Sequence, residues 1–145
     1  MNLHNLLDVS ALIALVDVEH EHNAVAFRWF DSAGYTDWGV CPLTETGFVR
    51  IMTNPIMGSH YRSIRQTYEM LAELATHPGY NYWPITESWT HLTGPFAARI
   101  NGHQQVTDAY LLGMAIKEDG VLVTFDRGMK YLAGPEFARN LLILE

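Results

Sequence analysis

Residues 120–128 read GVLVTFDRG: a glycine, an apolar and β-branched run, and then an acid at Asp126. An apolar run of this length, bounded by turn residues, is typical of a strand that is buried on both faces of a parallel sheet. In open parallel sheets, ligands bind beyond the carboxyl ends of the strands. The stretch therefore predicts a buried parallel strand that is followed directly by Asp126, at a binding crevice.

The rest of the chain alternates short apolar runs with longer segments of helical period, which predicts an α/β fold with helices on the faces of the sheet. We expect strands at 3–8, 38–42, 121–125 and, at the edge, 140–145, and a strand or extended segment at 80–85. We expect helices at 9–16, 23–34, 43–55, 61–79, 106–120 and 129–137, of which 61–79 is expected to be the longest. Residues 86–100 are less regular because Gly94-Pro95 interrupts them.

Helical spacing also predicts which side chains face the core. The expected stripes are Ala24, Phe27 and Phe30; Phe48, Val49 and Met52; Ile64, Tyr68, Leu71 and Leu74 or Ala75; and Ala109, Leu112 and Ile116.

Composition indicates one soluble domain over residues 1–145. The chain has 145 residues, of which 48% are hydrophobic, and one cysteine, Cys41, so an internal disulfide is impossible and a cytoplasmic location is expected. No apolar run approaches the roughly 18 residues of a membrane span. The net charge of −7 argues only weakly against a nucleic-acid partner, because carboxylates gathered around bound cations change the local field.

Four acids occupy related positions on this map. Asp8 and Asp126 each follow a predicted strand, whereas Glu45 and Asp108 each lie in the first turn of a predicted helix. All four can converge at the carboxyl edge of the sheet, where they would repel one another unless cations were bound. Oxygen ligands at a partly open site suit Mg²⁺ or Mn²⁺ better than Zn²⁺.

The segments LLDVSALIAL (6–15), TETGFVRIMTNP (44–55) and HQQVTDAYLLGMAIKEDGVLVTFDRG (103–128) resemble the PIN-domain nucleases, and specifically the VapC toxins of bacterial toxin–antitoxin pairs. The resemblance covers nearly the whole chain and implies a PIN-like three-layer α/β/α fold with a central, mostly parallel sheet. It places the family's acidic residues at Asp8, Glu45, Asp108 and Asp126, and its small hydroxylated residues at Ser10 and Thr124.

The resemblance implies a Mg²⁺- or Mn²⁺-dependent endoribonuclease that cuts transfer or ribosomal RNA and thereby stops translation and growth. Asp8, Asp108 and Asp126 would hold a metal ion that activates water, and Glu45 would complete a second metal position or orient that water. Ser10 and Thr124 would orient these groups. A cognate VapB-type antitoxin and a homodimer are also implied, but no membrane association.

Other residues are candidates for binding the RNA or the antitoxin. Arg50, on the Glu45 helix, and Arg62 and Arg65, three residues apart on one face of the 61–79 helix, are candidates for contact with RNA phosphates. The apolar faces of AVAFRWF (24–30) and YEMLAELA (68–75) are candidates for the antitoxin groove.

Purely structural roles remain possible for single residues, and other functions remain possible for the whole chain. Glu45 and Asp108 suit the first turn of any helix, and Asp126 suits a turn. The chain could be another phosphoryl-transfer hydrolase, such as a haloacid-dehalogenase phosphatase, although such enzymes need Asp-x-Asp where Asp8-Val9-Ser10 stands. It could also be a catalytically silent RNA- or protein-binding module. The histidines, including His20, His22 and His103, lack ligand spacing and are not assigned to the site.

Overall fold

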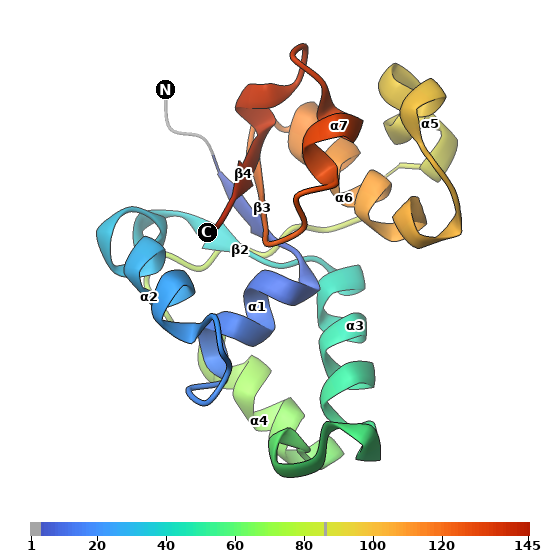
Figure 1. Cartoon of the computed structure of the whole chain (residues 1–145). Helices are drawn as coiled ribbons and strands as arrows, with labels where there is room; N and C mark the ends of the chain where they lie inside the picture. Colours follow the sequence, from blue (N-terminus) through green and yellow to red (C-terminus); the bar gives the residue numbers. More distant parts are fainter. Residues whose placement is uncertain (1–3, 86) are drawn as a thin grey trace.

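A four-stranded sheet in the order β2-β1-β3-β4, with every pair parallel, forms the centre of the computed structural model (Figure 1). The structure describes residues 4–85 and 87–145. The strands are β1 (Asn5–Leu7), β2 (Trp38–Gly39), β3 (Val121–Thr124) and β4 (Leu141–Ile143). Each is shorter than its predicted segment. Leu3 and Thr86, which began predicted segments, lie outside the described residues.

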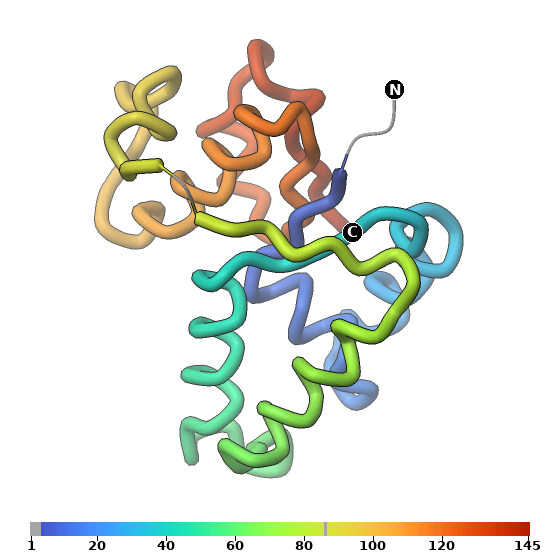
Figure 2. The backbone as a smooth tube through the Cα atoms, turned by 180° about the vertical axis from the view of Figure 1, so that it is seen from behind, coloured from blue at the N-terminus to red at the C-terminus, as the bar shows by residue number. Residues whose placement is uncertain are grey.

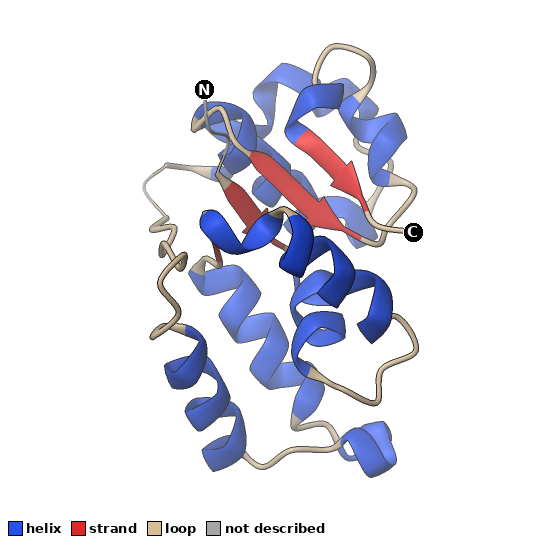
Figure 3. Cartoon of the chain, turned by 90° about the vertical axis from the view of Figure 1, so that its left-hand side faces the viewer, coloured by secondary structure: helices blue, strands red, loops and turns tan. Residues whose placement is uncertain are grey.

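The two central strands bury side chains on both faces because successive residues of a strand point to opposite sides. Leu6 and Leu122 are fully buried and pack with residues of α6 (Val106–Lys117) and α7 (Met129–Ala133). Leu7 and Val123, also fully buried, pack with α1 (Val9–Val16), α2 (Asn23–Ser32) and α3 (Pro42–Met52). The sheet thus lies between two groups of helices (Figure 3), which confirms the predicted three-layer α/β/α fold.

Helix α6 is buried nearly all round, so its predicted stripe of Ala109, Leu112 and Ile116 was too narrow. Residues 109–115 are all buried, because the sheet covers one side of the helix and α5 (Trp89–Thr93) covers another. Gly113 allows this close packing: a Cβ on it would lie 2.6 Å from the carbonyl oxygen of Leu92. The helix ends at Lys117 rather than at residue 120.

The prediction that segment 61–79 forms the longest helix is wrong. Helix α4 spans Ile64–Leu74, with 11 residues, whereas α6 has 12. Its start is fixed by a capping box, in which the Ser63 hydroxyl accepts from the Gln66 amide and the Gln66 side chain accepts from the Ser63 amide. The predicted stripe is only half buried: Leu71 and Leu74 pack against the core, but Ile64 is 59% and Tyr68 76% exposed.

The predicted face of α2 was wrong, and the predicted face of α3 was right. Ala24 is exposed and Phe27 is 55% exposed, while Ala26 is buried and Phe30 partly buried against the core. A short helix of mostly apolar residues offers several possible stripes, and contact with α1 selects the one centred on Ala26. In α3, Phe48 and Met52 are fully buried, with Val49 beside them, although the helix begins at Pro42 rather than at residue 43.

Residues 80–85 form an extended segment along β2, not a full strand. Tyr80 forms an isolated parallel bridge with Trp38, and the Trp83 amide donates to the Val40 carbonyl at 3.0 Å. The two segments run side by side in Figure 2. A Cβ on Gly39 would lie 1.7 Å from the Asn81 carbonyl oxygen, so only glycine permits this approach. After it, α5 leads into a 3₁₀ turn at Gly94–Arg99, in place of a longer helix. None of the described helices is long and apolar enough to cross a membrane.

Candidate active site

Asp8 stands between β1 and α1 and caps the helix. Its Oδ1 accepts from the Ala11 amide and from the Ser10 hydroxyl, each at 2.8 Å, and its Oδ2 accepts from the Thr124 hydroxyl. Aspartate is favoured at this position because it satisfies a free amide of the first turn and faces the positive end of the helix dipole. The side chain is only 4% exposed, so it is held in one orientation. Ser10 is itself contacted by the Phe125 amide, at 3.4 Å.

Thr124 connects the ends of the two central strands. Its buried hydroxyl donates to Asp8 and accepts from the Asp126 amide at 3.0 Å. Asp126 then closes a turn, because its Oδ1 accepts from the Gly128 amide at 2.8 Å. A hydroxyl that both donates and accepts fixes one acid by its side chain and the other by its backbone. Thr124 therefore sets the spacing of Asp8 and Asp126.

Asp108 enters the same region from the first turn of α6. Burial, followed by the charges of Asp8 and Asp126, raises its pKa from 3.8 to about 7. Burial also raises the pKa of Asp8 against the opposing effect of its three hydrogen bonds, and the charge of Asp126 adds to this rise. No side chain or amide of the described chain donates to the Asp108 carboxylate. The three aspartates thus lie in one another's field, and no lysine or arginine of the described chain is among the charges that shift the pKa values of Asp8 and Asp108.

Glu45 lies in the first turn of α3 but apart from this group. Burial alone raises its pKa, and it is absent from the charges that act on the aspartates. Burial and then the charge of Glu45 raise the pKa values of Tyr80 and Tyr82. Thr44, the residue before Glu45, donates its hydroxyl to the Leu7 carbonyl at 2.8 Å, which anchors α3 beside the end of β1. Glu45 therefore stands at the rim of the site.

These acids offer oxygen ligands only, which suits a hard divalent cation. As the side chains stand, no three histidine, cysteine, aspartate or glutamate residues of the described chain are grouped closely enough to hold a metal ion together. Mg²⁺ usually takes one or two carboxylates and keeps several waters, so it does not need three direct protein ligands. The Asp8 carboxylate already accepts three hydrogen bonds. In the described chain, the Asp108 carboxylate and the Oδ2 of Asp126 accept none, so these oxygens are open to a cation.

The predicted phosphate-binding arginines are dispersed. Arg62 precedes α4, and its Nη1 donates to the carbonyls of His60 and Tyr61 at 2.9 and 3.1 Å. It therefore does not share a helix face with Arg65, which is exposed in the first turn of α4. Arg50 is exposed on α3 and lines a groove between α3 and α4 together with Glu45. Arg50 thus shares a surface with the predicted acid Glu45.

Two features beside Asp126 were missed from the sequence. The loop 101–105, which includes His103, forms a polar hollow with Asp126 and Gly128. On another side, His22 stacks on Phe125 with ring centroids 5.0 Å apart and an interplanar angle of 18°. The loop is a run of polar residues just before the Asp108 helix, and that position was the available signal. The His22 contact joins distant segments and had no local signal.

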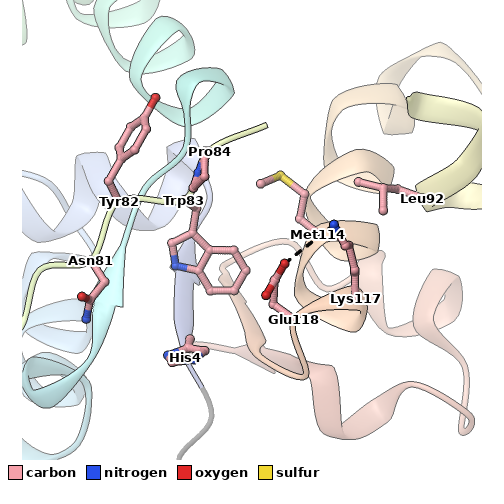
Figure 4. Close-up of a pocket in the computed structure, with 9 residues that line it drawn as sticks. All are labelled: His4, Asn81, Tyr82, Trp83, Pro84, Leu92, Met114, Lys117 and Glu118. Atoms are coloured by element: carbon pink, nitrogen blue, oxygen red, sulfur yellow. Dashed lines mark ion pairs between the residues drawn. The ribbon is translucent and has the colours of Figure 1, made fainter. Parts of the chain in front are cut away.

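Another pocket lies at the opposite end of the same elements. His4, before β1, Trp83, from the extended segment, and Met114, Lys117 and Glu118, from the end of α6, line it (Figure 4). The acids lie at the carboxyl ends of β1 and β3 and at the start of α6, so this pocket contains none of the predicted site residues.

Comparison with known proteins gives a consistent result. The PIN domain matches residues 6–135. Ribonuclease VapC44 of Mycobacterium tuberculosis is 37% identical over 131 residues, which cover 90% of this chain and 91% of the relative. Ribonuclease VapC38 of the same organism is 39% identical over 128 residues, which cover 88% and 89%.

A solved structure shows the same fold at low identity. It is the crystal structure of VapBC2 from Rickettsia felis bound to a DNA fragment from their promoter, in which a matching chain is 11% identical and superposes with a TM-score of 0.64. The match covers 99% of this chain and 100% of that chain.

Proposed function

The chain belongs to the PIN domain family, and we propose that it is the endoribonuclease toxin of a VapBC-type pair, which hydrolyses RNA with a divalent cation and thereby stops translation and growth. Transfer and ribosomal RNA, in the cytoplasm, are the proposed substrates. The observation that carries the proposal is that Asp8 and Asp126 are joined through the Thr124 hydroxyl and that the charges of both act on Asp108, although the three acids come from separate elements.

We assign the binding of Mg²⁺ or Mn²⁺ to these three aspartates. A bound cation of this kind neutralises charge on a phosphate and lowers the pKa of a water molecule so that it can attack phosphorus. The three donors to Asp8 hold its carboxylate in place before substrate arrives, so little reorganisation is needed. Asp108 and Asp126 supply the remaining open carboxylate oxygens, and Ser10 and Thr124 fix the geometry.

Glu45 has a separate role in this proposal. It does not share the field of the aspartates, and it stands where α3 meets the end of β1. From the rim it can accept a hydrogen bond from water or hold a second cation once RNA is bound. Its removal should therefore cost less activity than the removal of Asp8.

The test is cleavage of purified RNA by the full chain with Mg²⁺ or Mn²⁺ and with a chelator. We expect cleavage that requires the cation, a loss of orders of magnitude for Asp8→Asn, and a smaller loss for Glu45→Gln. Asp31→Asn, an exposed acid on α2, is the matched control and should cleave normally. No cleavage by the unaltered chain would favour the silent binding module. Hydrolysis of small phosphate esters without cleavage of RNA would favour the phosphatase alternative.

We further propose that a VapB-type antitoxin binds the groove between α2 and α4. Both segments assigned to the antitoxin contribute to it: Phe27 and Phe30 come from α2, and Met70 and Leu74 come from α4. The groove has a volume of about 590 Å³ and a largely apolar lining, as expected for an amphipathic helix laid into a groove. A basic antitoxin side chain that entered the acidic site would compete with the cation, so excess Mg²⁺ should weaken inhibition.

Homodimerisation is also proposed, and the α3–α4 groove is the candidate contact. Ile64 and Tyr68 are exposed there although they continue the apolar stripe of α4. Contact with a second copy would cover them.

A further inference from the structure

The polar hollow beside Asp126 lies between loop 101–105 and the turn 126–128. We call it the 101–105 hollow. Its volume is about 340 Å³, at the lower end of the range of roughly 300–1,000 Å³ for pockets that hold small ligands. Its side chains come from Asn101, His103, Gln104, Gln105 and Asp126, and the remaining lining residues are glycines. Asp126 therefore belongs both to the aspartate group and to this hollow.

The lining indicates what kind of group can occupy the hollow. It contains amides, an imidazole and a carboxylate, but no lysine, arginine or apolar side chain. A phosphate would find no cationic partner there and would be repelled by Asp126, and an apolar helix would find no apolar surface. A neutral group with donors and acceptors in a fixed pattern fits best, because side-chain amides carry both a donor and an acceptor. The edge of an RNA base is such a group.

Hydrogen bonds within loop 101–105 fix its conformation. The Gln105 Oε1 accepts from the Asn101 amide at 2.6 Å, and the Gln105 amide donates to the Gly102 carbonyl at 3.0 Å, which closes the loop on itself. The side chains of Asn101, His103 and Gln104 are exposed and make no hydrogen bond to any described residue. Their polar atoms are therefore available to a ligand, whereas Gln105 serves the loop.

We propose that the 101–105 hollow binds the base of the nucleotide next to the scissile phosphate and sets the sequence preference of cleavage. The inference rests on the proposed ribonuclease function and adds its specificity. Asp126 links the two because a phosphate at the aspartate group and a base in the hollow would lie on either side of the same residue. Asn101 and Gln104 provide the hydrogen bonds that distinguish one base from another.

The structure supplies two independent ways to disable the hollow. The double variant Asn101→Ala/Gln104→Ala removes polar atoms that support nothing else. Gly102→Leu instead adds a bulky side chain to a residue that lines the hollow: the backbone of Gly102 is extended, at φ 161° and ψ −167°, and a Cβ there would meet nothing within 4 Å. Gly94→Leu is the matched control, because a Cβ on Gly94 also meets nothing within 4 Å. Ser59→Ala, an exposed residue outside the site, controls for loss of a polar side chain.

The experiment measures cleavage of a pool of randomised RNA oligonucleotides by each full-length variant with Mg²⁺, followed by sequencing of the cleaved ends. We expect the unaltered chain and both controls to prefer one base beside the cut. Both hollow variants should lose that preference by about five-fold or more, as expected when a specific base contact is removed. Thermal unfolding should be unchanged in both.

Other results would overturn the inference. They are an unaltered chain that cuts without any base preference, or hollow variants that keep the preference while their rates fall equally on all sequences. Failure of the unaltered chain to cut any RNA is a different result, because it removes the proposed function itself together with this inference.

Discussion

Replacing Asp108 with asparagine should stabilise the folded chain at pH 8 when no divalent cation is present. The folded state raises the pKa of Asp108 from 3.8 to about 7, so near neutrality folding forces a carboxylate into a field that disfavours its charge. Each pKa unit corresponds to about 1.4 kcal/mol, which gives an upper limit of about 4 kcal/mol at pH 8. Because Asp108 is partly exposed, solvent screening reduces this to about 2 kcal/mol.

The sign of the pH dependence follows from the two pKa values. Between pH 4 and pH 7 the folded state retains the proton that the unfolded state has released, so the stability of the unaltered chain falls as the pH rises through this window. Above the folded-state pKa the loss is complete. Asparagine does not titrate, so the advantage of the variant should be about 2 kcal/mol at pH 8 and less than half of that at pH 5.

Urea unfolding of both proteins at pH 5 and pH 8, with a chelator, measures this difference directly. For a domain of this size, 2 kcal/mol corresponds to an increase in Tm of about 6 °C. Asp31→Asn controls for a simple change in net charge. Added Mg²⁺ should narrow the gap at pH 8, because a cation relieves the repulsion in the unaltered chain. Equal stabilities of Asp108→Asn and the unaltered chain at pH 8 would refute the raised pKa of Asp108, to which burial contributes most and the charges of Asp8 and Asp126 add.

Three further predictions concern other parts of the structure. Thr124→Val should lower RNA cleavage at least ten-fold and destabilise the fold by about 1–3 kcal/mol in urea unfolding, because it removes a donor to Asp8 and an acceptor for a backbone amide. Gly113→Ala should cost about 1–3 kcal/mol in the same assay, since its Cβ would approach a carbonyl oxygen of α5 at 2.6 Å, whereas Gly94→Ala should cost less than 1 kcal/mol. Tyr68→Ser should shift a dimer toward monomer in light scattering without loss of thermal stability, since Tyr68 is 76% exposed; an unchanged mass would exclude the α3–α4 groove as the dimer contact.

Local patterns predicted the layers of the fold better than the faces of its helices. The apolar runs around Leu6 and Leu122 implied burial on both faces, and the structure confirms this because each strand is covered by helices on both sides. The predicted buried face of α2 was wrong. So many residues of this helix are apolar that their spacing could not show that Ala26, rather than Phe27, faces the core. The length of α4 was overestimated because a capping box at Ser63 and a turn before Tyr80 limit the helix.

The acidic site was predictable in part. The sequence placed Asp8 and Asp126 after strands and Asp108 at a helix start, and a parallel sheet brings such positions to one edge. It could not show that Glu45 stands at the rim, because that depends on how the Thr44 hydroxyl anchors α3 to β1. Nor could it show that Thr124 bridges two acids 118 residues apart in the chain, counted from Asp8 to Asp126.

Local spacing, polarity and the order of elements along the chain were enough to predict the α/β class and to single out the four candidate acids. Only the packed structure shows that the charges of Asp8 and Asp126 act on Asp108, where apolar helix faces stay uncovered, and that the 101–105 hollow borders Asp126. These properties depend on distances between segments far apart in the chain. Such distances are fixed only when β1, β3 and α6 pack together.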